Sequence, residues 1–258
     1  MPSSVADLVR GRPEPWQTCV VQTCDEHLRT LVLLHGFTES ADQFCRQRVR
    51  QCRGDPLTAA LMARTRFVFV QSPTREISCY GGTKYTAWHD YLTDHGGEGR
   101  GDVEEVIDER HLAECRARIH RILDDEIALL DGDASRVAIG GQSQGGCTSL
   151  DAALTYPRLL GGAFVSFGHL YSCTPLPAAK RELRIWAFHG DGDGIIASSL
   201  VRPHHRHKCH THTSPRTAAH PFPVTPLAGE PLLLAAARRG LQHGLPARGA
   251  VARPLRGV

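Results

Sequence analysis

Hydrophobic residues in the first 200 positions form short continuous runs that alternate with longer segments of helical spacing. Short apolar runs of this kind fit strands that are buried on both faces. Their alternation with helices is typical of a mainly parallel sheet with helices on both sides, which is an α/β fold. The runs predict strands at 18–21, 30–34, 66–70, 137–140, 163–167 and 183–188.

The clearest helix is predicted over residues 103–130. Asp102 is expected to cap its first turn, with Glu105 three residues later, and Gly132 follows its end. A second helix is expected from Ser143 to about residue 154. The apolar residues of the first helix recur at helical spacing and predict one face against the sheet, formed by Cys115, Ile119, Ile122, Leu123, Ile127 and Leu130.

Beyond about residue 200 this pattern stops. Residues 201–258 hold eight of the 16 prolines and seven of the 15 histidines. The four prolines between 215 and 226 exclude a central strand there, and only 230–242 could form a helix. We therefore expect one domain over residues 1–200, followed by a basic tail over 201–258 that is atypical or disordered and lies outside the native fold.

Charge separates the same two regions. The net charge of +3 combines a body of about −5 with a tail of about +8. The acidic body offers no basic face for nucleic acid, and no apolar run approaches the roughly 18 residues of a membrane span. The first 11 residues do not resemble a signal peptide. The nine cysteines form no CxxC pair, which favours reduced thiols in a cytoplasmic protein.

The strongest chemical signal is the G-x-S-x-G motif formed by residues 141–145, which follows a predicted strand and precedes a predicted helix. A sharp strand-to-helix turn strains the serine backbone and leaves no room for side chains two residues to either side. The turn would expose the Ser143 hydroxyl. The Gln144 amide, at the start of the helix, could donate to a developing oxyanion.

A second oxyanion donor is predicted at the end of an earlier strand. The sequence LLHGF over 33–37 lets the chain bend at Gly36 and brings the Phe37 amide to the same sheet edge. We expect His35 to shape this loop and not to act as a base.

The acid of a serine triad follows a later strand in this architecture. Asp193 comes at a strand end, 50 residues after Ser143, in the sequence HGDGD. Asp191 is the alternative, but it directly follows Gly190 and is better placed to bond its own turn.

These motifs resemble the phospholipase/carboxylesterase family, which includes acyl-protein thioesterases and has the α/β-hydrolase fold. The resemblance covers about residues 28–200. It implies Ser143 as nucleophile, Asp193 as acid, and the Phe37 and Gln144 amides as oxyanion hole. The sequence departs from the family at His89, inside its usual W-F-D stretch, and at Gly194, where the family has proline.

The family's catalytic histidine has no clear counterpart. It would stand some 30–40 residues after the acid, in a G-x-x-H loop before a closing helix. His243 has the G-x-x-H form but is too distant, and His220 has nearer spacing without the motif. One hypothesis for the Ala-, Arg-, Gly- and Pro-rich tail is a reading-frame or splice error in a GC-rich gene. The alternative is a disordered extension on a complete enzyme.

The resemblance implies a serine hydrolase that cleaves carboxylic esters or thioesters through an acyl-enzyme, without cofactor or metal. Its substrates would be small acyl esters or lipid-modified protein. The His-rich segment 204–212 matches no closed zinc site. The competing hypothesis is a catalytically dead or truncated hydrolase-fold protein that lacks the triad histidine.

Overall fold

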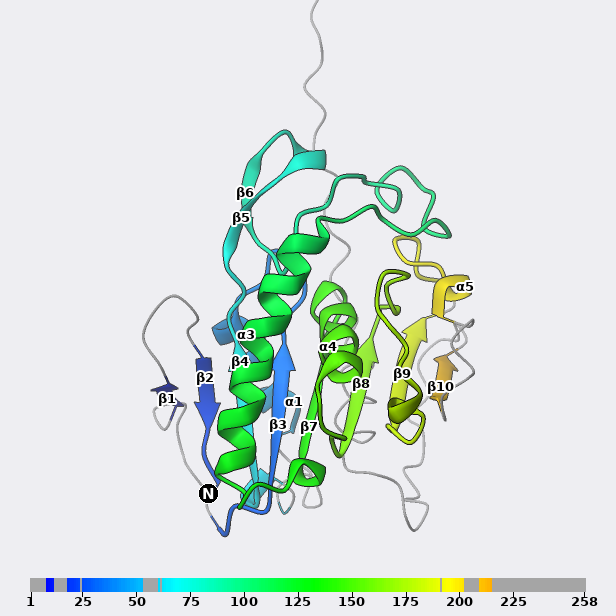
Figure 1. Cartoon of the computed structure of the whole chain (residues 1–258). Helices are drawn as coiled ribbons and strands as arrows, with labels where there is room; N and C mark the ends of the chain where they lie inside the picture. Colours follow the sequence, from blue (N-terminus) through cyan, green and yellow to red (C-terminus); the bar gives the residue numbers. More distant parts are fainter. Residues whose placement is uncertain are drawn as a thin grey trace, which may run out of the picture.

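The computed structural model describes residues 8–11, 18–23, 25–52, 60, 62–190, 192–201 and 209–214. Within them the chain forms an eight-stranded sheet and a separate two-stranded hairpin (Figure 1). The sheet has the order β1-β2-β4-β3-β7-β8-β9-β10. Its strands are β1 (Leu8–Gly11), β2 (Thr18–Val21), β3 (Arg29–Leu34), β4 (Thr65–Val70), β7 (Val137–Gln142), β8 (Gly162–Ser166), β9 (Ile185–Gly190) and β10 (Cys209–Ser214). The hairpin consists of β5 (Thr74–Ile77) and β6 (Thr83–Thr86).

All neighbouring strands from β4 to β10 pair in parallel, whereas β2 pairs antiparallel with both β1 and β4. In the centre of the sheet, Leu34 of β3 lies opposite Gly141 of β7. The carboxyl ends of β3, β7, β8 and β9 therefore meet at one edge, where an open α/β sheet binds its ligands.

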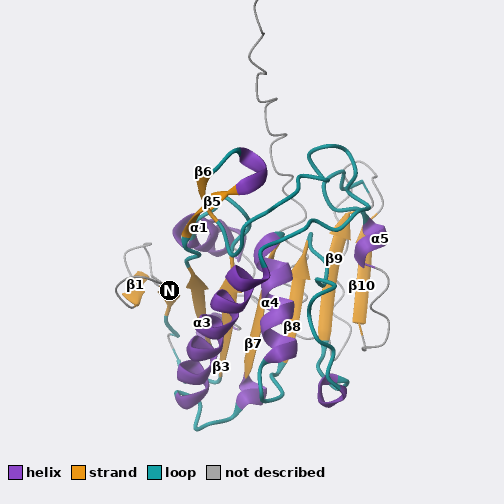
Figure 2. Ribbon diagram, turned by 45° about the horizontal axis from the view of Figure 1, so that its top comes forward, coloured by secondary structure: helices purple, strands orange, loops and turns teal. Residues whose placement is uncertain are grey.

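Helices cover both faces of the sheet. Figures 1 and 2 show α3 (Glu109–Ala128) and α4 (Gln144–Thr155) side by side over one face, with α1 (Ala41–Cys52) on the other. A short helix, α5 (Ser198–Val201), follows β9, and 3-10 turns occupy η2 (Ser78–Tyr80), η3 (Ala134–Arg136) and η4 (Ala178–Lys180).

The last four residues of β3 form a continuous apolar run, and apolar and polar residues do not alternate along it. Val32 and Leu34 belong to the core on the α3/α4 side, whereas Leu31 and Leu33 belong to the core with Phe44 of α1. A strand between two helical layers buries both sets of side chains, so a continuous apolar run is what the position requires.

The predicted α/β fold is confirmed, and each of the six predicted strands is present. The largest displacement is in β9, which was expected at 183–188 and lies two residues later. The second predicted helix is also present as α4, and Gly132 follows the end of α3 as expected.

The predicted start of the long helix is wrong. Helix α3 begins at Glu109, and its N-cap is Asp108, whose carboxylate accepts hydrogen bonds from the amides of Arg110 and His111. Residues 102–107 are instead held against the preceding loop. Glu105 accepts from the Thr93 hydroxyl and from two loop amides, and the Leu92 amide donates to the Val106 carbonyl. These contacts compete with helix formation and outweigh the local capping signal.

The interpretation that the regular pattern stops near residue 200 is corrected by β10. This strand pairs in parallel with β9, from Cys209 opposite Ile185 to Ser214 opposite Gly190. Its sequence, CHTHTS, has no apolar run and therefore did not predict a strand. At a sheet edge, the backbone hydrogen bonds to a neighbouring strand can specify a strand without such a run. The domain boundary at 200 stays a prediction, since 202–208 and 215–258 lie outside the described residues.

Candidate functional site

Ser143 lies at the sharp turn between β7 and α4, as the motif predicted. Its backbone has φ 52° and ψ −128°, a left-handed geometry that is rare for a residue with a side chain. The Ser143 amide donates to the Ser166 carbonyl at 2.8 Å, and its carbonyl accepts from the Cys147 amide at 3.0 Å. The turn is thus held by β8 on one side and by the helix on the other.

The two glycines of the motif are required because a side chain at either position would clash with neighbouring backbone. A Cβ on Gly141 would lie 2.5 Å from the Leu34 carbonyl oxygen, and one on Gly145 would lie 2.2 Å from the His35 carbonyl oxygen. Both obstacles are backbone atoms that cannot turn aside. The close approach of the β3 and β7 strand ends therefore requires glycine at both positions.

Phe37 and Gln144 follow the ends of these two adjacent strands. Gln144 is the first residue of α4, where amides have no partner within the helix. Neither the Phe37 nor the Gln144 amide takes part in the turn, cap or side-chain hydrogen bonds of the described residues. Both amides thus lie at the sheet edge that carries Ser143, where they could donate hydrogen bonds to an anion.

The Gln144 side chain has a separate role that the sequence did not predict. It is fully buried, with Oε1 accepting from the Trp88 amide at 2.9 Å and Nε2 donating to the His89 carbonyl at 3.1 Å. The indole of Trp88 donates to the His35 carbonyl at 2.8 Å. Residues 88–89 thereby tie the start of α4 to the loop after β3.

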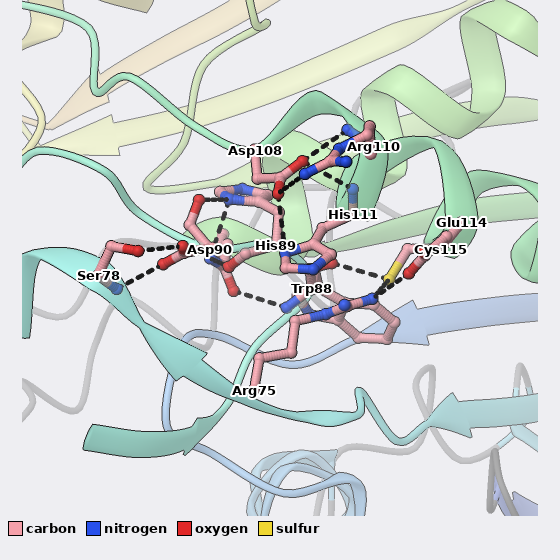
Figure 3. Close-up of polar contacts among 11 residues, drawn as sticks. Arg75, Ser78, Trp88, His89, Asp90, Asp108, Arg110, His111, Glu114 and Cys115 are labelled. Atoms are coloured by element: carbon pink, nitrogen blue, oxygen red, sulfur yellow. Dashed lines mark hydrogen bonds and ion pairs between the residues drawn. The ribbon is translucent and has the colours of Figure 1, made fainter. Parts of the chain in front are cut away.

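Figure 3 shows how the Trp88-His89-Asp90 segment is held in turn. The Asp90 carboxylate accepts from the amide and the hydroxyl of Ser78, and the Trp88 carbonyl accepts from the Cys115 thiol at 2.8 Å. His89 is buried, and its burial lowers its pKa to about 4. The residue that departs from the family's motif therefore occupies a closed interior position as a neutral imidazole.

His35 shapes its loop, as expected. Its Nδ1 donates to the Gly36 carbonyl at 2.8 Å, and its Nε2 accepts from the Ser72 amide at 3.1 Å. Burial lowers the pKa of His35 to about 4, so the ring is neutral and both of its nitrogens are used. This histidine has no free nitrogen with which to activate a serine.

Asp193 stands after β9, at the same end of the sheet. Its Oδ1 accepts from the amides of Ile195 and Ile196, and its Oδ2 lies 3.8 Å from Nε2 of the buried His189. That nitrogen also lies 2.6 Å from the Ile196 carbonyl. Asp193 is therefore fixed by its own turn with one oxygen left over, whereas Asp191 lies outside the described residues.

The base is not among the contacts of Ser143. In the part of the chain that the structure describes, no histidine hydrogen bonds to the Ser143 side chain. His220 and His243 both lie outside the described residues. These two candidates stay predictions.

Another residue with a positive φ follows β8 and was not expected. Phe167 has φ 56°, and its amide donates to the Phe188 carbonyl at 2.8 Å. Positive φ at an aromatic residue is unfavourable and is kept only where surrounding contacts enforce it. The centroid of its ring lies 6.4 Å from that of His189 in β9, whose Nε2 is also the nitrogen near Asp193. The local sequence SFGH carries no signal for this.

The described residues lack two further features, a membrane-spanning helix and a cluster of metal ligands. None of their helices combines the length and apolar character that crossing a membrane requires. They also contain no group of three or more metal-ligating side chains placed to hold an ion.

Comparison with known proteins agrees with this arrangement. A probable carboxylesterase of Oryza sativa subsp. japonica is 32% identical over 139 residues, which are 52% of this chain and 57% of that protein. The match thus spans little more than half the length of that relative. Acyl-protein thioesterase 1 of Schizosaccharomyces pombe is 27% identical over 185 residues, 67% of this chain and 72% of the relative.

Among solved structures, the L63A variant of Arabidopsis thaliana SOBER1 matches with a TM-score of 0.62 at 21% identity. The alignment covers 83% of this chain and 98% of that one, and it shows the shared fold. The model of the phospholipase/carboxylesterase family matches residues 17–224. The chain belongs to the phospholipase/carboxylesterase family, within the α/β-hydrolase fold.

Proposed function

We propose that this chain hydrolyses carboxylic esters or thioesters, with Ser143 as the nucleophile that forms an acyl-enzyme. The observation that carries the proposal is the strained turn at Ser143, with φ 52°, between β7 and α4. Backbone strain of this kind clusters at active sites, where the surrounding structure holds a side chain in place. A serine in that position attacks a carbonyl carbon and is released by water in a second step.

The Phe37 and Gln144 amides would hold the oxyanion of the tetrahedral intermediate. Their place at the ends of neighbouring parallel strands supports this role, as does the position of Gln144 at the amino terminus of a helix. Loss of one such donor typically costs about 100- to 1,000-fold in turnover.

Asp193 would orient the catalytic histidine and stabilise its charged form. Asp193 Oδ2, which accepts neither of the turn hydrogen bonds, and the place of Asp193 after β9 support this assignment. His243 and His220 are the candidates for the base. The reaction needs no cofactor or metal, because the charges that develop are met by side chains and main-chain donors.

The names of the relatives support a substrate class. Two of them are named carboxylesterase and acyl-protein thioesterase, so we propose acyl esters or thioesters as substrates, lipid-modified protein among them. The cytoplasm fits this proposal, and the six cysteines whose side chains the structure describes are free thiols.

An active-serine phosphonate probe tests the assignment. We expect rapid labelling of the folded full-length chain that is lost in Ser143→Ala and kept in Ser135→Ala, whose exposed serine lies at the opposite end of β7. Turnover of a p-nitrophenyl or thioester substrate should fall in parallel. Absence of labelling in folded wild-type protein would favour the competing function, an inactive hydrolase fold.

The base can then be identified in labelled protein. Removing a triad histidine typically lowers turnover on the order of a millionfold. We expect this loss in one of His243→Ala and His220→Ala, with circular dichroism showing that the variant is folded. Full activity in both variants rejects both candidates.

A further inference from the structure

Of the six cysteines whose side chains the structure describes, three are buried: Cys45, Cys115 and Cys147. Two of them are ordinary core thiols. The Cys115 thiol donates to the Trp88 carbonyl, and burial raises its pKa to about 12. Burial likewise raises the pKa of Cys45 to about 12. Such thiols stay protonated and unreactive.

Cys147 is in a different setting, one turn after Ser143 in α4. Its sulfur accepts a hydrogen bond from the His169 amide at 3.3 Å and lies 3.8 Å from His169 Nδ1. On the far side of that ring, Nε2 lies 3.6 Å from Glu104 Oε1. The side chains of Cys147, His169 and Glu104 thus form a line of thiol, imidazole and carboxylate, drawn from α4, the loop after β8 and the segment before α3.

This order is the arrangement by which a protein activates a thiol. Burial by itself would raise the pKa of Cys147, but the charge and hydrogen bonds of His169 outweigh it, and the pKa is lowered. Burial would lower the pKa of His169, yet Cys147 and Glu104 raise it to about 10. Burial would raise the pKa of Glu104, but the interactions with His169 and Ser172 outweigh this effect and lower it.

The three shifts agree with one charge distribution: thiolate, imidazolium and carboxylate. The Tyr171 side chain, another neighbour of Cys147, also lowers the pKa of the thiol. The first turn of α4 adds the positive end of a helix dipole. Cys147 is thus distinguished from Cys45 and Cys115 by the groups around it, since all three are buried.

We propose that Cys147 is a modification site for hydrogen peroxide, which oxidises its thiolate to a sulfenic acid. The sulfur attacks one peroxide oxygen, so that an S–O bond forms while the O–O bond breaks. Sulfur loses two electrons to the peroxide, and the departing hydroxide takes the proton of the His169 imidazolium and leaves as water. The products are Cys147 sulfenic acid, water and neutral His169.

Burial selects the reagent. Cys147 is 2% exposed, so a small uncharged oxidant can enter on local opening, whereas a bulky alkylating reagent cannot. The Glu104 side chain is 26% exposed, so the array reaches solvent at its carboxylate end.

The modification is expected to disturb Ser143, a consequence that rests on the proposed function. A Cβ on Gly168 would lie 2.9 Å from the Cys147 sulfur and 3.0 Å from the Ser143 carbonyl oxygen. Gly168 therefore fills the space between the two residues. An oxygen added to the sulfur lacks room on that side and pushes the segment that lies against the Ser143 turn.

The test treats the folded full-length protein with hydrogen peroxide, removes the peroxide with catalase, and unfolds the protein in guanidinium that contains dimedone. Peptide mass spectrometry then measures the label at each cysteine. We expect Cys147 to be labelled at least tenfold faster than Cys115 and ahead of the more exposed Cys173, whose pKa is raised by burial. Equal labelling of Cys147 and Cys115 overturns the proposal.

Two variants separate the array from general accessibility. Glu104→Gln, which keeps shape, should slow Cys147 labelling severalfold, and His169→Gln should slow it at least tenfold, with Cys115 labelling unchanged in both. Unchanged Cys147 labelling in folded His169→Gln rejects the activated thiolate.

A second readout follows Ser143. Peroxide should lower phosphonate labelling of Ser143 in the wild type but not in Cys147→Ala, each protein being compared with its own untreated sample. Because dimedone detects Cys147 directly, the modification site is tested even if Ser143 is not labelled at all. Oxidised protein with undiminished Ser143 labelling rejects the coupling between the two residues.

Discussion

Gly145 of α4 packs directly on the carbonyl oxygen of His35, at the point where the loop after β3 passes the Ser143 turn. The added Cβ would be 2.2 Å from that oxygen and 2.6 Å from the Leu34 carbonyl oxygen. The serine turn and the loop of the proposed oxyanion donor Phe37 are thus in contact through backbone atoms. Each fixes the position of the other.

Gly145→Ala is therefore expected to be strongly destabilising. No rotamer relieves a clash with backbone, so the strands or the helix must shift, at a cost of about 3 kcal/mol in the free energy of unfolding. Urea denaturation measures this loss. Gly190→Ala is the matched control, because a Cβ there meets nothing within 4 Å. Equal stability of the two variants would show that the contact is not rigid.

The start of α3 gives a second prediction. Asp108→Ala removes the carboxylate that accepts from the Arg110 and His111 amides, and should cost about 1 kcal/mol of stability. Asp102→Ala, at the exposed position that the sequence suggested as cap, should change stability little. Paired urea titrations distinguish the two, and a larger loss at Asp102 would return the helix start to the predicted position.

The ion pair between Asp151 and Arg116 ties α4 to α3. Asp151 is fully buried and accepts from Arg116 Nε at 2.7 Å, Arg116 Nη2 at 2.8 Å and the Thr174 hydroxyl at 2.8 Å. Asp151→Asn leaves the Arg116 charge without its partner, and we expect a loss of about 3 kcal/mol.

The control for this loss is Glu26→Gln, which removes an exposed ion pair with Arg64. Exposed pairs of this kind add little to stability. Thermal and urea unfolding should therefore leave Glu26→Gln near the wild type. A similar small effect for Asp151→Asn would mean that solvent reaches the buried pair.

Acid should destabilise the protein through His35 and His89. Their pKa values of about 4 lie below the ordinary value of 6.5, so the unfolded chain binds more protons between these limits. The stabilisation that comes from keeping these two histidines neutral is complete above pH 6.5 and falls as pH drops toward 4, by up to about 1.4 kcal/mol per pH unit for each histidine. The pKa of His169 is raised in the folded protein, so the stabilisation that it provides is fully present below pH 6.5. That stabilisation stays constant as pH drops further and does not offset this fall.

His89→Gln tests this dependence. Carboxylates titrate in the same range in both proteins, so the difference between the two slopes isolates the histidine. We expect the free energy of unfolding of His89→Gln to fall less steeply between pH 6.5 and 4 than that of the wild type. Parallel curves would show that His89 is not held neutral.

Local sequence determined the strands and the turn at Ser143. A continuous apolar run such as that of β3 reflects burial on two faces, and G-x-S-x-G reflects a turn with no room beside the serine. Both are short-range constraints, in which the residues that carry the signal are also those that form the element. The predictions from them hold for β3, β7 and α4.

Tertiary structure decided what depends on distant partners. Asp102 and Glu105 have the spacing of a helix cap, but the Glu105 carboxylate accepts hydrogen bonds from the amides of His95 and Gly96 instead. Strand β10 forms by pairing with β9 in spite of its polar sequence. Cys147, His169 and Glu104 lie far apart along the chain and meet only when α4, the β8 loop and the segment before α3 come together. No local pattern encodes such contacts, because their energy depends on the burial and charge that folding creates.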